Sequence, residues 1–384
     1  MMPPKNILFL IGNYPSYGGT EIVTTTLANK FIADGHNVTI GSYGQPQDEN
    51  VDLGLSPKCK LLNLTRPVLS FKNIKRLREF VLTQKTDIII NQWVIPFYAT
   101  LVWKFALWGT KCKVFSVSHS KPDTNGRIKE LERRISNGEK YLKSLRWAMR
   151  EISRISLAFC IKCSDKFILL SPSFIPIAKK YARVSGKDKF ISIPNPITIV
   201  APSGTPHKVK EIIYVGRIEY IQKHTYRVID IWRELEQKHP EWRLTIVGDG
   251  KERSDIERRI KEYGLERVTI TGFVDPVEYY KRASILLLTS EYEGFGLVIV
   301  EAMTYGVVPI VYNSYETAGE LITNGVDGAL VDTPYSVEAC TDTLENLIKN
   351  EDTLNKIACN ARSSSARFSI DNIVNEWYKL MERE

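Results

Sequence analysis

Short apolar runs alternate with helix-like segments along most of this 384-residue chain, and this alternation limits the folds that it can adopt. Residues 6–11 (NILFLI) have the composition of a strand, 12–19 are rich in turn residues, and 20–33 carry apolar residues at helical spacing. Repetition of strand, loop and helix predicts a mainly parallel sheet with helices on both faces. Further strands of this first half are expected at 38–43, 60–64, 87–91, 114–118 and 167–171.

A proline-rich stretch interrupts the pattern and indicates a domain boundary. Pro194-Asn195-Pro196 is followed by APSGTP at 201–206, and neither a helix nor a central strand favours such a sequence. A chain of this length also exceeds what one hydrophobic core usually serves. The pattern then restarts, with strands expected at 211–216, 243–248, 268–272, 285–289, 308–312 and 329–331.

We therefore predict an α/β protein with two Rossmann-like, doubly wound domains. The N-terminal domain is expected at 1–195 and the second at 196–367. Residues 368–384 carry apolar side chains at helical spacing and are expected to form a helix that docks on a domain surface. In parallel sheets of this kind, ligands bind beyond the carboxyl ends of the strands.

The net charge of +8 conceals a difference between the two halves. Residues 1–195 contain 30 Lys and Arg against 14 Asp and Glu, a charge of +16, and 196–384 contain 22 against 30, a charge of −8. From Arg127 to Lys162, basic residues interleave with Leu, Ile, Trp and Met, as in a basic amphipathic helix or helix pair. Such a face suits an anionic membrane surface, and an ordinary solvated face is the alternative. No RNP-like strand, zinc-finger spacing or helix-turn-helix pattern occurs, so no nucleic-acid partner is expected.

The apolar segments indicate a protein without a membrane span, because none reaches about 18 uninterrupted apolar residues. The nearest, 93–108, contains Pro96 and Lys104 and is expected to be a buried helix. The first apolar run is too short for a secretory signal, and six cysteines in a chain of this length do not make a disulfide framework. We expect a cytoplasmic protein, peripheral on the inner face of the membrane. Cys160-x-x-Cys163 lacks a second ligand pair and is expected to be structural.

The motif EGFGLVIVE at 293–301 is the most informative for function. It follows a predicted buried strand, and its glycines can open into a helix that runs to about Tyr305. Free N–H groups at such a helix start favour a phosphate. Glu293 would lie at the mouth of the loop, with Glu301 about two turns into the helix, and both can accept hydrogen bonds from sugar or ribose hydroxyls. Alternatively, one acid caps the helix and the other is solvated.

Two other loops carry groups that suit a diphosphate. Gly18-Gly19 follows the first strand and permits close backbone approach to a diphosphate, or forms a tight turn without a ligand. Arg217 and Lys223 follow the first strand of the second domain. These two cations can neutralise a departing nucleoside diphosphate, or form surface salt bridges.

His119 and Ser171 each come just after a predicted strand of the first domain, where ligands bind in parallel sheets. A satisfied, partly buried histidine is the alternative for His119. No His, Asp and Glu grouping with metal-ligand spacing occurs in the sequence, so no protein-held metal is expected.

Together these motifs resemble those of the retaining glycosyltransferase family 4, of the bacterial surface-polysaccharide type. The resemblance implies the fold called GT-B, in which two Rossmann-like, doubly wound domains face each other across a cleft. The resemblance covers nearly the whole chain, and the motifs follow in the family's order. They are Gly18-Gly19-Thr20-Glu21, Ser171-Pro172-Ser173, Ile193-Pro194-Asn195, VGRIEYIQK at 215–223, EGFGLVIVE at 293–301, and Glu301-Ala302-Met303 running on to Gly306 and Pro309.

The resemblance implies a role for each matching position in binding the donor. Glu301 matches the acid that binds the ribose hydroxyls, and Glu293 the acid that contacts the donor sugar. Arg217 and Lys223 match the pair that holds the diphosphate. The backbone expected around the diphosphate is that of Gly18, Gly19, Phe295, Gly296 and Leu297.

His119 matches a histidine near the donor sugar. Phe273 and Val274 match the positions whose backbone groups contact the base of the nucleotide in this family. The residues expected to be catalytic are Glu293, His119, Arg217 and Lys223. The basic insert between Arg127 and Lys162 is longer than a minimal member needs, which leaves the sugar and acceptor open.

The expected activity is transfer of a sugar, with retention, to a sugar or lipid-linked acceptor in cell-surface glycan synthesis. UDP-sugar is the favoured donor, GDP-sugar stays open, and no cofactor is expected. The alternatives are a nucleotide-sugar epimerase of the same architecture and a non-catalytic binder of membranes or polyanions.

Overall fold

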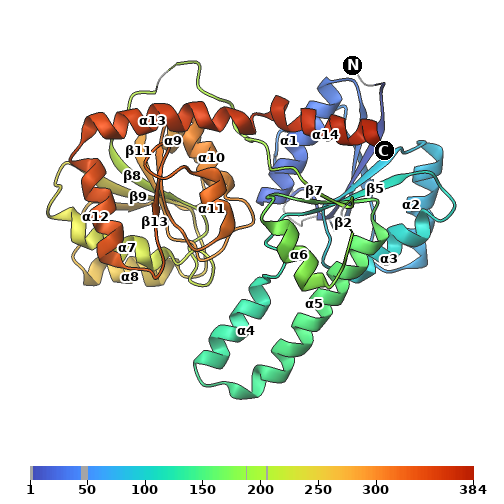
Figure 1. The fold of residues 1–384 in the computed structure, drawn as a ribbon, viewed down its shortest axis with the longest axis horizontal. Helices are drawn as coiled ribbons and strands as arrows, with labels where there is room; N and C mark the ends of the chain where they lie inside the picture. Colours follow the sequence, from blue (N-terminus) through green and yellow to red (C-terminus); the bar gives the residue numbers. More distant parts are fainter. Residues whose placement is uncertain (1–2, 45–50, 187, 205) are drawn as a thin grey trace. The chain divides into compact units, whose positions relative to one another are not determined.

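The computed structural model describes residues 3–44, 51–186, 188–204 and 206–384 (Figure 1). The chain divides into two compact units, and each is a parallel sheet covered by helices, which confirms the predicted α/β class. Unit 1 contains the chain up to Thr198 together with residues 370–384, and unit 2 is Ile199–Ser369. The boundary expected after residue 195 lies three residues before this division.

In the described part of unit 1, seven parallel strands form one sheet in the order β3-β2-β1-β4-β5-β6-β7. The central strand β1 pairs with β2 and β4, and Ile7 to Ile11 are all buried, which explains the uninterrupted apolar sequence. The sequence analysis did not predict β7, which lies at the edge of the sheet and ends two residues before Pro194, where the proline-rich stretch begins. The strands are β1 (Asn6–Asn13), β2 (Asn37–Gly44), β3 (Lys60–Asn63), β4 (Ile88–Asn91), β5 (Lys113–Ser118), β6 (Lys166–Leu169) and β7 (Phe190–Ser192).

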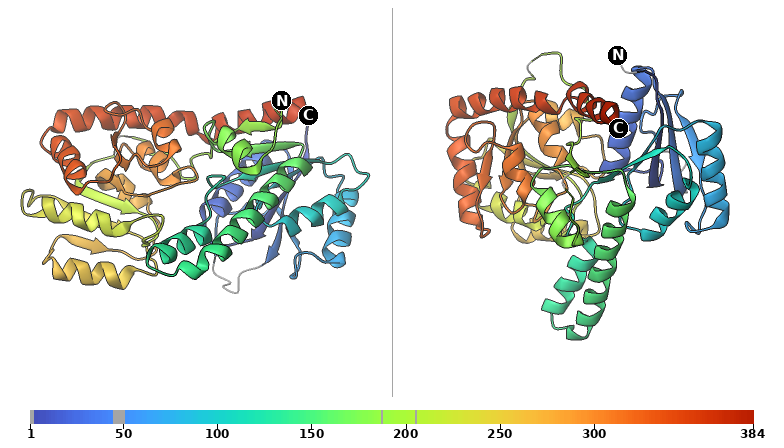
Figure 2. Two further views of the ribbon diagram at one scale, coloured as in Figure 1. Left: turned by 60° about the horizontal axis from the view of Figure 1, so that its bottom comes forward. Right: turned by 45° about the vertical axis from the view of Figure 1, so that its right-hand side comes forward.

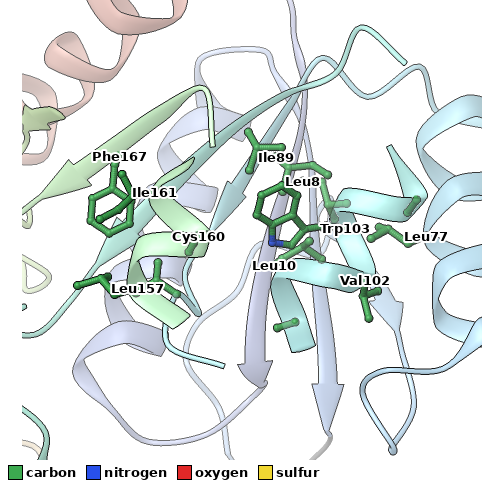
Figure 3. Close-up of a cluster of buried hydrophobic side chains, with 14 of the residues drawn as sticks. Leu8, Leu10, Leu77, Ile89, Val102, Trp103, Leu157, Cys160, Ile161 and Phe167 are labelled. Atoms are coloured by element: carbon green, nitrogen blue, oxygen red, sulfur yellow. The ribbon is translucent and has the colours of Figure 1, made fainter. Parts of the chain in front are cut away.

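A core on one side of this sheet holds two helices against β1 and β4 (Figure 3). Trp103 lies beside Leu8, Leu10 and Ile89 of the sheet, with Cys160 and Leu157 of a second helix further to one side. Cys160 is buried in the same core and its thiol donates to Ser116 Oγ at 3.4 Å, as suits a structural cysteine. The helices of unit 1 before the last are α1 (Gly19–Ala33), α2 (Phe71–Thr83), α3 (Phe97–Ala106), α4 (Gly126–Ser136), η1 (Lys140–Leu142), α5 (Lys143–Cys163) and α6 (Phe174–Ala182).

The sequence analysis predicted a buried helix at 93–108, but only one side of this helix is buried. The helix α3 begins only after Pro96, which suits a helix start because it has no N–H to leave unpaired. Val102 and Trp103 are buried, but Phe97 and Phe105 on the opposite side are exposed. The sequence is apolar all round, whereas the protein covers only one face.

The basic segment forms a helix pair, α4 and α5 joined by η1, which extends away from the sheet of unit 1 (Figures 1 and 2). Much of its charge is compensated within the pair. Arg133 lies 2.8 Å from Glu130, and Arg154 lies 2.8 Å from Glu151. The continuous basic face expected from the sequence is therefore divided by ion pairs, since other contacts join Lys129 and Arg146 to Glu132, and Arg134 to Glu139.

The described part of unit 2 contains a six-stranded parallel sheet in the order β10-β9-β8-β11-β12-β13. All six strands occur where the sequence predicted them, to within one or two residues. They are β8 (Val209–Val215), β9 (Arg243–Val247), β10 (Val268–Ile270), β11 (Ala283–Leu288), β12 (Val308–Tyr312) and β13 (Ala329–Val331). The helices are α7 (Thr225–Glu236), α8 (Arg253–Glu262), α9 (Val277–Arg282), α10 (Leu297–Thr304), α11 (Glu316–Leu321), α12 (Val337–Ile348), α13 (Glu351–Ser365) and η2 (Ala366–Phe368).

The last helix, α14 (Ile370–Arg383), packs on α1 of unit 1. Val374, Trp377 and Met381 lie on its buried face, at the spacing of one side of a helix. Tyr378 donates to Asp34 at 2.7 Å beside this contact. The chain thus returns to its first domain after completing the second.

Candidate active site

The candidate site of unit 2 is built from loops that follow the carboxyl ends of parallel strands. The loop after β8 carries Arg217 and Lys223, and the loop after β11 carries Glu293. Strands β8 and β11 are neighbours in the sheet, so their loops emerge side by side. This adjacency brings together residues that are about 70 positions apart in the sequence.

Lys223 and Glu293 form a largely buried ion pair. Lys223 Nζ donates to Glu293 Oε1 at 2.6 Å, and the two side chains are only 12% and 8% exposed. Gln222 Nε2 donates to the other carboxylate oxygen of Glu293 at 3.1 Å and to the Tyr292 carbonyl, also at 3.1 Å. Both oxygens of Glu293 therefore have a donor, and its carboxylate is fixed at the tip of the loop.

Gln222 also connects this pair to Arg217. Arg217 Nη2 donates to Gln222 Oε1 at 3.0 Å, while most of the Arg217 side chain is exposed to solvent. The amide group thus joins Arg217 on one side to Glu293 on the other. Sequence analysis missed Gln222, because its contact with Glu293 depends on β8 and β11 being neighbours in the sheet.

Glu301 lies near the start of α10, on the buried side of the helix. It is 6% exposed, and its Oε2 accepts from the Tyr280 hydroxyl at 3.2 Å. Burial, and then Glu301 itself, raises the pKa of Tyr280 well above its usual value, so the hydroxyl remains a donor. The helix begins at Leu297, which puts Glu301 about one turn inside it rather than the two turns predicted.

Neither acid is a helix cap or a solvated side chain, so the alternative interpretation of the motif is wrong. The N-cap of α10 is Gly296, with φ +97°, where a residue with a Cβ would be strained. The N–H groups of Leu297 and Val298 lie in the first turn, where a helix supplies no carbonyl partner, whereas the Ile299 N–H donates to the Gly296 carbonyl at 2.9 Å. Phe295 is buried and packs edge-on against Phe368, 5.6 Å between ring centroids, which holds the loop on unit 2.

Two buried hydroxyl groups near Glu293 have no hydrogen-bond partner in the described part of the chain: Ser290 Oγ and the Tyr315 hydroxyl. Ser314 Oγ donates to the Ser290 carbonyl at 2.7 Å, which joins their two loops. Burial, and then the charge of Glu293, raises the pKa of Tyr315 well above its usual value. Unsatisfied buried hydroxyls are uncommon, and a ligand with several hydroxyl groups would supply partners.

Phe273 and Val274 follow β10, and both residues are exposed. The loops after β8 and β9 approach each other closely beside these residues. A Cβ on Gly248 would come within 1.9 Å of the Gly216 carbonyl oxygen, so only glycine fits there.

The predicted site residues of unit 1 lie at the carboxyl-end edge of its own sheet. Gly18 is the N-cap of α1 and Gly19 its first residue, with open space where a Cβ would stand on Gly19. Ser171 Oγ lies 2.6 Å from Ser173 Oγ.

His119 follows β5 directly, and its Nε2 is in a short hydrogen bond with Gln92 Oε1. Burial lowers the pKa of His119 to about 4, so the imidazole is neutral at pH 7. Its buried Nδ1 has no partner among the described residues. His119 thus keeps one free acceptor atom.

In the parts of the chain that are described, no group of three or more His, Cys, Asp or Glu is arranged to hold a metal ion. Likewise, none of the described helices is long and apolar enough to cross a membrane.

Known protein families match both halves of the chain. The family described as Glycosyl transferases group 1 matches residues 197–364, and Glycosyltransferase Family 4 matches residues 17–200. The chain belongs to these glycosyltransferases. The match to the second half contains Arg217, Lys223, Glu293 and Glu301, which carry the geometry described above.

Several curated relatives align along almost the whole chain. An uncharacterized glycosyltransferase of Haemophilus influenzae is 26% identical over 98% of this chain and 100% of its own. The amylovoran biosynthesis glycosyltransferase AmsD of Erwinia amylovora is 25% identical over 98% and 99%. A third, from Campylobacter jejuni, is 26% identical over 98% of each, and its name describes an α-1,4-N-acetyl-D-galactosaminyltransferase acting on a glycan linked to PP-undecaprenol.

Solved structures show the same fold. Anabaena HepE in complex with UDP and glucose has a TM-score of 0.74 at 19% identity, covering 99% of this chain and 100% of its own. The lipopolysaccharide outer core galactosyltransferase WaaB has a TM-score of 0.71 at 21% identity, covering 97% and 99%. The fold is thus GT-B, as the sequence predicted.

Proposed function

We propose that this glycosyltransferase moves a sugar from a nucleoside diphosphate sugar, with UDP-sugar favoured over GDP-sugar, to a sugar or lipid-linked acceptor in bacterial surface glycan synthesis. The observation that carries the proposal is the network Arg217–Gln222–Glu293–Lys223 beside the first turn of α10. The relatives' names supply the glycan context, and the complexes of HepE with UDP support the choice of base.

The network suits departure of a nucleoside diphosphate. As the bond from sugar to phosphate lengthens, negative charge grows on the diphosphate, and Arg217, Lys223 and the N–H groups of the first turn of α10 stabilise it. Lys223 would shift from Glu293 to the phosphate, which frees one carboxylate oxygen for a sugar hydroxyl. The resemblance implies that the leaving phosphate accepts the proton of the acceptor and that the anomeric configuration is retained.

The experiment that tests this proposal is incubation with a panel of UDP- and GDP-sugars, with and without a bacterial lipid extract. Transfer consumes donor and yields a glycosylated product only with acceptor present. An epimerase would convert the donor alone, and a binder would consume neither. Conversion of the donor to its epimer without transfer would overturn the proposal.

Replacing Glu301 with alanine should weaken UDP binding by about 1.5–3 kcal/mol, the usual contribution of hydrogen bonds to a charged group. In the proposed complex, Glu301 accepts from the ribose hydroxyls, and it already accepts from Tyr280. Glu301→Gln should weaken binding less, because the amide keeps one acceptor. Calorimetric titration with UDP measures both, and an unchanged affinity for the alanine variant would contradict the assignment.

Treatment with a chelator should leave transfer intact. The proposed charge stabilisation comes from Arg217, Lys223 and backbone N–H groups, so it requires no protein-held metal. Transfer is measured after EDTA treatment and again with Mg²⁺ or Mn²⁺ restored. A loss that either ion reverses would show that a metal takes part.

We further propose that the protein works as a peripheral protein on the cytoplasmic face of the membrane, where a lipid-linked acceptor would be found. The charge of +16 on residues 1–195 favours an anionic surface.

A further inference from the structure

We infer that Thr289 is a positioning residue: its buried hydroxyl holds a strained turn at His224, and this turn fixes the main chain from which the Lys223 side chain extends. The inference rests on the proposed function, because it concerns how Lys223 is held in place to meet the leaving diphosphate. Thr289 follows β11 directly and is fully buried, whereas Lys223 and His224 end the loop between β8 and α7.

His224 has a main-chain conformation that is unusual for its place in the fold. It is the N-cap of α7, with φ +46° and ψ +45°, whereas N-cap residues usually have an extended main chain. In the described part of the chain, two other non-glycine residues have a positive φ, Lys85 and Arg183. Both lie at the C-terminal end of a helix, where this conformation is common. At His224 the Cβ makes the left-handed conformation costly.

The His224 side chain does not explain this conformation through a contact with phosphate. Burial lowers the pKa of His224 to about 4, so the imidazole carries no charge at pH 7. Its Nδ1 lies 3.1 Å from the hydroxyl of Tyr226, in the first turn of α7. A neutral imidazole bound to its own helix supplies no positive charge for a diphosphate, so the function of the turn lies in its main chain.

Three consecutive carbonyl groups at this turn accept hydrogen bonds from the loop that follows β11. Thr289 Oγ1 lies 3.2 Å from the carbonyl oxygens of both Lys223 and His224, so one hydroxyl donates to two carbonyls. The Glu291 N–H donates to the Gln222 carbonyl at 2.7 Å. A strained conformation persists only where its surroundings fix it, and these bonds fix the turn.

The same loop also holds the side chain of Lys223. Thr289 binds the Lys223 carbonyl, and the Glu293 carboxylate binds the Lys223 ammonium group at 2.6 Å. In the proposed reaction a diphosphate takes the place of the carboxylate, so the main chain stays fixed and the side chain alone moves. A charged group that is aligned in advance needs no reorganisation during the reaction, and a small displacement of such a group lowers turnover strongly.

Steady-state kinetics on the full-length protein test this role of Thr289. Thr289→Val removes the hydroxyl and nearly keeps the shape, and it should lower kcat at a saturating concentration of sugar donor by about tenfold or more. Thr289→Ser keeps the hydroxyl and should retain most of the wild-type kcat. Thr245→Val is a matched control, because Thr245 is also buried in unit 2 and its hydroxyl donates to Glu211 at 2.6 Å, outside the site. The control should change kcat by less than about twofold.

The Lys223→Ala background separates positioning from a general loss of structure. If Thr289 acts through Lys223, Thr289→Val should change kcat by less than about twofold in this background, because the ammonium group that the turn positions is then absent. A tenfold loss in both backgrounds overturns the inference. So does a Thr289→Val protein with wild-type kcat.

Glycine at position 224 offers a rescue, because glycine adopts the left-handed conformation without strain. Adding His224→Gly to Thr289→Val should restore kcat to within about threefold of wild type. His224→Ala removes the same side chain but keeps the Cβ, so adding it to Thr289→Val should restore nothing. Equal kcat for these two double variants overturns the inference.

Thermal unfolding tests the turn without relying on activity. With Thr289 in place, His224→Gly should unfold at a higher temperature than His224→Ala, since alanine is strained at a positive φ. In the Thr289→Val protein the turn can relax around alanine, so the advantage of glycine over alanine should fall by about half or more. No advantage for glycine, or an advantage that Thr289→Val leaves unchanged, overturns the inference.

These unfolding temperatures also separate the inference from the proposed function. Failure of the unaltered protein to transfer a sugar from any donor would refute the proposed function. The comparison of glycine with alanine at position 224 would still decide whether Thr289 holds the turn. Conversely, a wild-type protein that transfers sugar normally, with a Thr289→Val variant that does so equally well, would refute only the role of Thr289.

Discussion

Alanine at Lys223 or at Arg217 should lower turnover, measured at a saturating concentration of sugar donor, by about 10²- to 10³-fold. This is the usual effect of removing one hydrogen-bonding group that stabilises a charge developing in the transition state. The negative charge that these cations meet grows as the diphosphate departs, so the loss should appear mainly in kcat. Arg217 gives the cleaner test, because most of its side chain is exposed and its removal should hardly change fold stability.

Steady-state kinetics with the best donor of the panel measures this effect, and thermal unfolding checks the fold. Lys210→Ala is a matched control, since Lys210 is an exposed lysine on β8 of the same unit and lies outside the site. Turnover within a few-fold of wild type for both Arg217→Ala and Lys223→Ala would refute their role at the leaving group.

Most of the fold was predictable, because parallel sheets buried on both faces leave clear apolar runs in the sequence. The central strand β1 and the strands β11 and β12 of unit 2 are of this kind. The failures have physical causes. Strand β7 ends just before the proline-rich stretch, whose turn residues dominate the pattern there. The uniform apolarity of α3 conceals that only the side with Val102 and Trp103 is covered.

The acids and cations of the candidate site could be located from the sequence, but their partners could not. Glycine loops after strands indicated Glu293 and Lys223, yet the 2.6 Å bond between them depends on β8 and β11 being neighbours. Local sequence patterns do not show which strands are neighbours in a sheet. Gln222 was therefore not identified, although it contacts both Arg217 and Glu293. Burial likewise decided that Glu301 is not solvated surface.

Alanine at Glu293 should lower kcat/KM about 100-fold, through two losses. The donor sugar would lose a charged acceptor, a contact of about 1.5–3 kcal/mol. Lys223, only 12% exposed, would lose the carboxylate that positions its ammonium group. Glu293→Gln keeps an acceptor but removes the charge, and should therefore fall between wild type and the alanine variant.

A double-mutant cycle separates the two losses. If the bond between Lys223 and Glu293 positions both groups, the two alanine substitutions together should cost less than the sum of their separate effects, with an interaction energy of about 0.5–3 kcal/mol. The reason is that either single variant already leaves its largely buried partner uncompensated. Arg217→Ala with Glu293→Ala provides the comparison, because among the described residues those two side chains are linked through Gln222 and not to each other. Strict additivity of Lys223→Ala and Glu293→Ala in kcat/KM would mean that the pair acts as two independent residues during turnover.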